Sequence, residues 1–359
     1  MLPFKIFLLP GFLSLAILLS CEPNAPSSLG TTSLKPDFVT DPTPTDTDDP
    51  AIWIHPDDPE QSLILGTDKG DDNGGVYVFN LEGKLLKEKS ITGLPRPNNI
   101  DIEYGFVLNG DTIDIAVFAQ RNADNIRILR VPEMTFIDNG GIAVFNGEEV
   151  QSPMGVGLYK APESGNIYAA ISRKSGPDGS YLWQYLLKDS FGIVIGKPVR
   201  KFGAFKGGKE IEAIAVDDEM GYLYYSDEGA GVRKYYAHPD SSAIELAFFA
   251  NQNFTDDHEG ISIYTQPGGK GYILVSDQQA NRFHAFTREG IPGNPHEHKR
   301  IGIIPVSTVD SDGSEACSTP LGKHFPKGIF VAMSSDKTFQ IYRWEQLEAR
   351  LQRMDKPTE

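Results

Sequence analysis

The chain has 359 residues, with 49 acidic and 33 basic side chains, and its formal net charge at pH 7 is −16. This balance argues against a nucleic-acid-binding protein, because phosphate backbones are held by clustered lysine and arginine. The apolar share of 40% is sufficient for a hydrophobic core. The 36 glycines and 25 prolines favour many short strands joined by turns over long helices.

Residues 1–20 predict an export signal that is not part of the fold. Lys5 precedes an apolar run, which Pro10 and Gly11 interrupt and which ends in Leu-Leu-Ser before Cys21. This ending resembles a bacterial lipoprotein signal with Cys21 as the lipidated first mature residue; an ordinary secretory signal is the alternative. Glu22 follows Cys21 where a signal for inner-membrane retention more often has aspartate. We therefore expect export and a lipid anchor at the bacterial cell envelope, in the outer membrane.

Residues 21–47 are rich in proline, serine, threonine and aspartate, a composition typical of a flexible tether. The folded domain is expected to span residues 48–349. If Cys21 is lipidated, Cys317 has no partner for a disulfide. Stability must then come from packing or from bound ions.

One hairpin pattern occurs six times: an apolar strand that ends in polar residues, a short turn, and a second apolar or aromatic strand. The copies are residues 62–80, 111–130, 166–187, 221–236, 271–286 and 327–344. They begin roughly 50 residues apart, which is a period typical of propeller blades. Another strand candidate precedes each of the first five copies, at residues 51–55, 100–106, 155–160, 212–217 and 259–264. Residues 318–326 occupy the sixth position less convincingly.

These repeats predict an all-β fold, a six-bladed β-propeller with four-stranded antiparallel blades over residues 48–349. Six sheets arranged radially bury both faces and protect nearly all of their edges. A β-sandwich with accidental internal similarity is the alternative.

Equivalent positions in different blades lie on one ring around the central channel of a propeller. The second strands end at Lys69, Arg121, Lys174, Glu228, Gln278 and Ser335. The innermost strands begin at Asp48 and Asp49, Asp101, Met154, Glu212, Glu259 and Asp312. Five of the six innermost positions are acidic, and crowded carboxylates repel one another. One end of the channel is therefore expected to bind cations.

Carboxylates together with amide oxygens are hard donors that suit Ca²⁺ or Mg²⁺. Lys69, Arg121 and Lys174 form a basic arc on the same rim. Arginine offers a planar fork for phosphate oxygens and lysine a point charge, so cations and metals together indicate a polyphosphate ligand.

Four segments resemble the motifs of the β-propeller phytases, in the same order. They are DDPAIWIHP (48–56), NNIDIEY (98–104), EIEAIAVDDEMGYLYYSDE (210–228) and DHEGISIY (257–264). The resemblance covers residues 48–344. It implies hydrolysis of phytate, myo-inositol hexakisphosphate, of the 3-phytase type, with calcium phytate as the preferred substrate.

The resemblance also implies residue roles. Calcium ligands or water-positioning groups would be Asp48, Asp49, Asn99, Glu212, Glu228, Asp257, Glu259, Gln278 and Asp312. Substrate phosphates would be bound by Lys69, Arg121 and Lys174. Catalysis is assigned to Glu212, Glu228, Lys174 and Arg121, with several calcium ions and a calcium-activated water as the nucleophile.

The sequence departs from the family in three places. Met154 stands where the family commonly has a tyrosine, Gly70 replaces a second lysine, and acidic residues for additional structural calcium ions are not evident near the end of the chain. We expect a monomer, bound to the membrane by its lipid anchor only. A non-catalytic calcium-dependent binding protein, or another propeller hydrolase such as a lactonase, is the alternative function.

Overall fold

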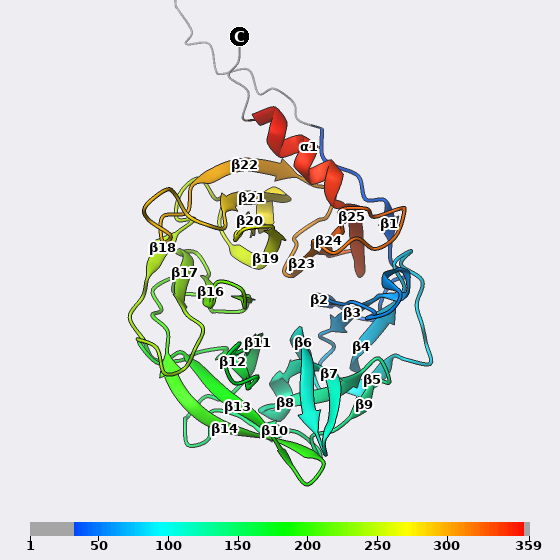
Figure 1. The fold of residues 1–359 in the computed structure, drawn as a ribbon, viewed down its shortest axis with the longest axis vertical. Helices are drawn as coiled ribbons and strands as arrows, with labels where there is room; N and C mark the ends of the chain where they lie inside the picture. The colour runs from blue at the N-terminus through cyan, green and yellow to red at the C-terminus, as the bar shows by residue number, and fades with distance from the viewer. Residues whose placement is uncertain (1–31, 355–359) are drawn as a thin grey trace, which may run out of the picture. The chain divides into compact units, whose positions relative to one another are not determined.

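The computed structural model describes residues 32–354, with side chains described as far as residue 352. The predicted signal peptide, Cys21 and the first part of the predicted tether lie outside the described residues. Within the described range, 24 strands form six sheets of four around a central axis, and a short extra strand joins one of them (Figure 1). The prediction of a six-bladed β-propeller with four-stranded antiparallel blades is confirmed.

The first three blades follow the chain from the innermost strand outwards. Blade 1 consists of β2 (Thr47–Trp53), β3 (Leu63–Asp68), β4 (Gly74–Phe79) and β5 (Ile91–Leu94). Blade 2 consists of β6 (Pro97–Leu108), β7 (Asp111–Gln120), β8 (Asn125–Val131) and β10 (Ile142–Ala143), with β9 (Thr135–Phe136) also pairing with β8. Blade 3 consists of β11 (Pro153–Lys160), β12 (Ile167–Arg173), β13 (Leu182–Ser190) and β14 (Ile193–Phe202).

The remaining blades continue in the same order, except that the last one takes its outermost strand from the start of the domain. Blade 4 consists of β15 (Ile214–Asp217), β16 (Tyr222–Asp227), β17 (Gly231–Tyr236) and β18 (Ala247–Phe249). Blade 5 consists of β19 (His258–Gln266), β20 (Lys270–Asp277), β21 (Arg282–Thr287) and β22 (Arg300–Pro305). Blade 6 consists of β23 (Ser314–Cys317), β24 (Ile329–Ser334), β25 (Thr338–Arg343) and β1 (Phe38–Val39).

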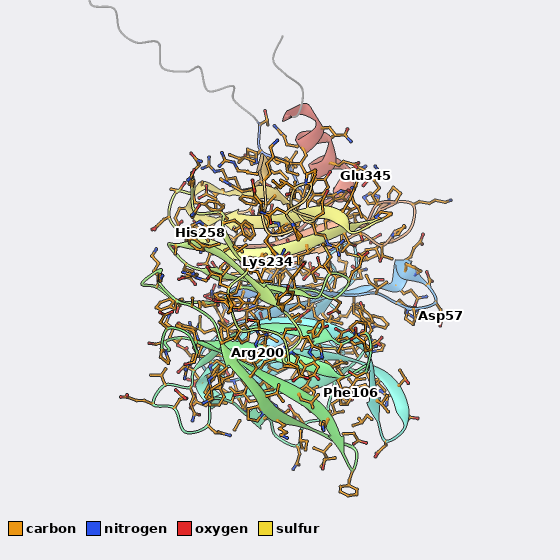
Figure 2. All side chains as sticks on the ribbon, turned by 60° about the vertical axis from the view of Figure 1, so that its left-hand side comes forward. Asp57, Phe106, Arg200, Lys234, His258 and Glu345 are labelled. Atoms are coloured by element: carbon orange, nitrogen blue, oxygen red, sulfur yellow. The ribbon has the colours of Figure 1, made fainter. Side chains whose placement is uncertain are left out.

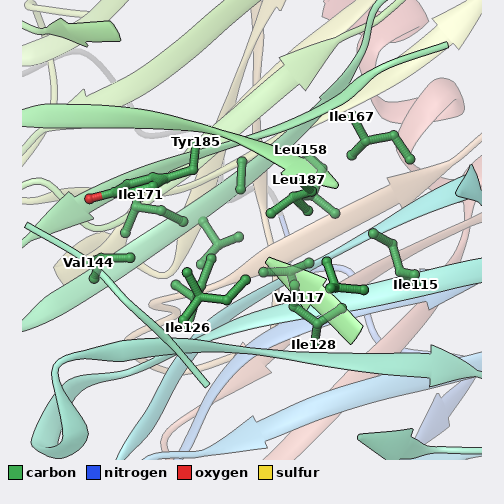
Figure 3. Close-up of a cluster of buried hydrophobic side chains, with 14 of the residues drawn as sticks. Ile115, Val117, Ile126, Ile128, Val144, Leu158, Ile167, Ile171, Tyr185 and Leu187 are labelled. Atoms are coloured by element: carbon green, nitrogen blue, oxygen red, sulfur yellow. The ribbon is translucent and has the colours of Figure 1, made fainter. Parts of the chain in front are cut away.

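The hydrophobic core is divided into clusters that lie largely between neighbouring blades. Val117 and Ile128 of blade 2, for example, pack in one cluster with Leu158 and Ile171 of blade 3 (Figure 3). Because both faces of such a blade are covered, its middle strands are apolar along their whole length and do not alternate. This packing explains why the sequence repeats contain continuous apolar runs.

The ring is closed by β1, which pairs with β25 and completes blade 6. Asp37 fixes this junction, because its side chain accepts hydrogen bonds from the backbone N–H and Nε of Arg343 and from Nε2 of Gln346, at 2.7 to 2.8 Å. Helix α1 (Trp344–Met354) follows β25 directly. The second half of the predicted tether is therefore part of the folded domain, and the domain continues beyond residue 349.

The sixth innermost strand lies earlier in the chain than the sequence indicates. It is β23, which ends at Cys317, whereas residues 318–326 form an irregular loop. Pro320, Gly322 and Pro326 explain the difference, since proline lacks the N–H that a strand needs and glycine favours turns. The described helices include none that is both long and apolar enough to span a membrane.

Replacing Asp37 with alanine should loosen the closure of the ring. The substitution leaves three hydrogen-bond donors at the β1–β25 junction without their acceptor, so we expect the free energy of unfolding to fall by about 1 to 3 kcal/mol. Thermal or denaturant unfolding measures this change. Asp57→Ala is the control, because Asp57 is exposed on a surface turn (Figure 2) and should shift stability by no more than about 0.5 kcal/mol. Equal stability of the two variants would contradict the role of Asp37.

Candidate active site

A cavity of about 470 Å³ opens at one end of the channel, where second strands end and innermost strands begin. It is lined by six carboxylates, three lysines and one amide: Lys69, Lys174, Lys209, Glu210, Glu212, Glu228, Asp257, Glu259, Gln278 and Asp312. Eight of these ten residues are among the candidates from the sequence; Lys209 and Glu210 are not. Blades 1, 3, 4, 5 and 6 each contribute to this cavity, although more than 240 residues separate its first member from its last.

Three glutamates form the tightest acidic group. Carboxylate oxygens of Glu210, Glu212 and Glu228 all lie within 4.8 Å of one another, and Glu212 and Glu228 are buried. Glu210 was missed in the sequence, although it precedes Glu212 by two positions. In an extended segment this spacing places both side chains on the same side, and that signal could have identified Glu210.

Burial and mutual repulsion favour the protonated form of these glutamates. Burial, with a further contribution from Asp48, raises the pKa of Glu212 to about 8. Burial, with the charges of Glu212 and Glu210, raises the pKa of Glu228 to about 9. The same causes raise the pKa of Glu259 well above its ordinary value. These carboxyl groups therefore favour their protonated forms at neutral pH, and a cation would have to displace the protons.

Lys69 is the most firmly held cation of the site. Its Nζ lies 2.8 Å from Oδ1 of Asp48 and 2.5 Å from Oδ2 of Asp312. Burial by itself lowers the pKa of Lys69, but the charges of Asp48, Asp312 and Glu212 outweigh it and raise the pKa. Lys69 therefore stays charged and offsets part of the acidic charge.

Asn98 links two of the carboxylates. Its Nδ2 donates to Oδ2 of Asp48 at 3.1 Å and to Oε1 of Glu212 at 2.9 Å, and all three residues are buried. The sequence predicted Asn99 for the site and aligned Asp101 with the acidic ring. The structure brings Asn98 to the ring position in their place.

Three predicted ligands do not line this cavity. Asp48 lies behind its wall and is reached through its ion pair with Lys69. The other two are Asp49 and Asn99. Both line a second cavity of about 350 Å³ along the channel, together with Asp101 and Glu315. Oδ2 of Asp49 accepts a hydrogen bond from the backbone N–H of Ile100 at 3.1 Å, which fixes its direction. The predicted ligand set is therefore divided between the two cavities.

The predicted basic arc is only partly open to the cavity. Lys174 is half-exposed, lines the cavity and is paired with Glu210. Arg121 does not line the cavity; one Nη lies 4.0 Å from Oε1 of Glu212 and contacts the sulfur of Met154. Met154, which stands where the family commonly has a tyrosine, is completely buried and packs against Arg121.

The blade 5 side of the cavity is a hydrogen-bonded group. Nε2 of Gln278 donates to Oδ1 of Asp312 at 2.5 Å, and Nε2 of Gln279 donates to Oδ2 of Asp257 at 2.8 Å. Lys209 pairs with Asp257 across the boundary between blades 4 and 5. His258 takes no part in this group, because its ring lies on the opposite side of the strand and Nε2 bonds with the carbonyl oxygen of Ala250 at 2.6 Å.

The donor set fits a hard divalent cation. Oε1 of Glu228 and Oε2 of Glu259 are buried and have no hydrogen-bond partner within the described part of the chain. Such orphaned carboxylate oxygens are costly unless a cation or water binds them. Carboxylate oxygens at this density are the ligands that calcium prefers.

The sequence matches the family profile described as Phytase over residues 12–356. The chain belongs to the phytase family. A 3-phytase from Bacillus subtilis (strain 168) is 30% identical over 335 residues, which cover 86% of this chain and 81% of that protein.

Among solved structures, a chain in the crystal structure of a mitotic checkpoint complex has a TM-score of 0.49 and 13% sequence identity. The alignment covers 92% of this phytase and 98% of that chain. No conclusion rests on this likeness.

Asn98→Ala should weaken cation binding by this phytase. Without the shared amide, Glu212 and Asp48 lose the hydrogen-bond donor that orients both carboxylates, so we expect calcium affinity at pH 7 to fall about tenfold, as for about 1.4 kcal/mol. Isothermal titration with Ca²⁺ measures the affinity. Asn251→Ala, at an exposed position, is the matched control and should leave affinity unchanged. Unaltered affinity in a folded Asn98 variant would contradict the bridging role.

Proposed function

We propose that this protein is a calcium-dependent phosphomonoesterase that hydrolyses phytate to lower inositol phosphates and phosphate. Membership of the phytase family and the similarity to a 3-phytase support the substrate. The single observation that carries the calcium dependence is the cavity itself, in which six carboxylates surround three lysines. A phosphate-rich ligand would be repelled from this cavity unless cations first offset the acidic charge.

Calcium ions would be held by the carboxylates of the cavity, above all by Glu210, Glu212, Glu228 and Glu259. When bound, calcium supplies positive charge that draws phosphate oxygens into the cavity and makes water more acidic. Glu210 joins the ligands proposed from the sequence because its oxygens lie within the same 4.8 Å group. Asp49 and Asn99 would serve a cation only along the channel, since they line the second cavity.

The lysines of the cavity would bind the phosphates of the substrate. Of the three predicted phosphate-binding side chains, Lys174 is the most free to move, because half of its side chain is exposed. Its partner Glu210 would bind the calcium ion instead. The Nζ of Lys174 can then turn to a phosphate oxygen. Lys69 is held between Asp48 and Asp312, so it provides fixed charge close to the transferring phosphoryl group.

Glu212 and Glu228 are the groups whose protons a cation must displace before it can bind. Their raised pKa values, about 8 and about 9, mean that each carboxyl group favours its protonated form at neutral pH when no cation neutralises it. Arg121 acts beside them, since its guanidinium faces Oε1 of Glu212 and would favour its charged form. No covalent enzyme intermediate is required by this arrangement.

The location of the enzyme in the cell is a further proposal from the sequence. We propose that the protein is exported and anchored to the outer membrane through a lipid on Cys21, and that it is a monomer. Labelling with a radioactive fatty acid, lost in Cys21→Ser, tests the anchor.

Purified protein should release phosphate from phytate when Ca²⁺ is present and lose this activity when a chelator is added. Lys174→Ala should lower kcat/KM by about a hundredfold, because a charged contact to the phosphoryl group is lost. Lys87→Ala, at an exposed position of blade 1 outside the cavity, is the control and should retain full activity. A folded protein that binds calcium but releases no phosphate from any phosphate ester would overturn the proposal and favour a binding protein.

Calcium binding should release protons. Because burial raises the pKa of Glu212 and Glu228 above 7, both favour the protonated form at neutral pH, and a cation must displace these protons. The apparent calcium affinity should therefore rise as the pH increases from 7 to about 9. Titration calorimetry in two buffers of different ionisation enthalpy counts the released protons. Glu228→Gln should release fewer, and proton-neutral binding by the unaltered protein would contradict the raised pKa values.

A further inference from the structure

The hairpin formed by β13 and β14 exposes apolar side chains that nothing in the described chain covers. Phe191 at its turn is 98% exposed, the largest exposure of any large hydrophobic residue in the described part. Ile193, Ile195 and Val199 of β14 are between 38% and 47% exposed. Apolar residues gathered on one surface element usually mark a contact with a partner or a membrane.

The turn holds Phe191 away from the rest of the molecule. Phe191 has a backbone φ of +54°, a conformation that non-glycine residues rarely adopt. Asp189 fixes this conformation, because its carboxylate accepts hydrogen bonds from the backbone N–H of Gly192 at 2.7 Å and of Asn109 at 2.9 Å. The second bond ties the hairpin to the β6–β7 turn, next to Val107, which is 56% exposed. Phe191 is therefore held in solvent by an unfavourable backbone conformation, and its ring has no role in the packing of the propeller.

Lysines lie on the same face of the hairpin as the exposed aliphatic residues. The strand register places Lys188 opposite Ile195 and Lys197 opposite Leu186, on the face that carries Ile193 and Ile195, whereas Lys201 lies opposite Trp183 on the other face. Lys201 also contacts Glu148 and the ring of Trp183, whereas Lys188 and Lys197 have no salt bridge within the described residues. Residues 182–202 carry four basic side chains and one acidic side chain, so their net charge is 4 − 1 = +3, in a chain whose net charge is −16.

From these observations we propose that the β13–β14 hairpin docks the propeller on an anionic lipid bilayer. Aromatic and aliphatic side chains enter the boundary between headgroups and acyl chains, while neighbouring lysines pair with lipid phosphates. This contact would add a second attachment to the proposed lipid on Cys21 and would fix the orientation of the propeller on the bilayer.

A second copy of the chain fits this surface less well. In a symmetric dimer the lysines of the two hairpins would face each other and repel. Pairing along the edge of β14 is also blocked, because Pro198 lacks an N–H and the N–H of Val194 already donates to the carbonyl of Ile137 at 2.8 Å. An anionic surface satisfies both the lysines and the apolar side chains.

The position of the hairpin also determines which way the active-site cavity faces relative to the membrane. At the start of β13, Tyr181 donates a hydrogen bond to the carbonyl oxygen of Lys174, at the rim of the cavity. The strand then runs away from the cavity for nine residues, so the turn at Phe191 lies at the opposite end of the blade. Docking through this turn leaves the cavity open to the solution, where a soluble polyphosphate can enter it.

Quenching by brominated lipids tests this proposal in the lipidated full-length protein, reconstituted into vesicles. Phe191→Trp introduces an exposed indole, since the three natural tryptophans are buried. We expect at least twofold quenching in vesicles of phosphatidylglycerol and phosphatidylethanolamine, and weaker quenching in phosphatidylcholine. Adding Lys188→Glu and Lys197→Glu should abolish it.

Val309→Trp is the matched control. Val309 is 43% exposed, and its carbonyl oxygen accepts a hydrogen bond from the backbone N–H of Ser335 at the cavity end.

Equal quenching at positions 191 and 309, or none at either, would overturn the proposal. So would a lipid-free dimer that Phe191→Ser dissociates, because the surface would then belong to a second copy. Phosphate release by Phe191→Ser in detergent solution should equal that of the unaltered enzyme. This readout separates a failure of docking from a failure of the proposed function.

Discussion

Electrostatic repulsion among buried carboxylates dominates the end of the channel. Each of these groups would be solvated if it stood alone on a surface, but the ring of blades turns several of them inwards onto one small volume. Protonation, Lys69 and a bound cation are three ways to relieve the repulsion, and they compete with one another. The site is therefore an arrangement whose charge balance depends on what enters it.

The propeller suits such a site because it separates stability from function. The apolar faces between blades bury the hydrophobic side chains, as Val117 and Leu158 illustrate, so the end of the channel is free to carry unfavourable charge. Short connections at the strand ends then present acids, amides and lysines from five blades to one cavity. A change in one blade end alters the site without a change in the core.

The sequence was sufficient for the architecture because the blades repeat, and a repeat reveals which positions are equivalent. The same reasoning located Glu212, Glu259 and Lys174. It failed where the ladder is irregular: bulges interrupt the pairing between Thr47 and Pro50 and between Pro97 and Ile100. A bulge changes which of two adjacent side chains faces the cavity. For this reason Asn98, and not Asn99 or Asp101, takes the ring position. The same bulge recurs in blades 3 and 5, where it makes Met154 and Glu259 equivalent to Asn98, so an alignment of the blades on the bulge would have identified Asn98. Lys209 was missed because it lies in a loop, outside the repeat.

The junction between β1 and β25 has a consequence for the order of events when the protein is made. Its two strands are about 300 residues apart in the chain, as the bonds between Asp37 and Arg343 show. The ring therefore stays open until nearly the whole polypeptide has emerged, and contacts of such long range form slowly. The export that we propose for this chain would gain from this delay, since early blades alone cannot close the ring before translocation ends.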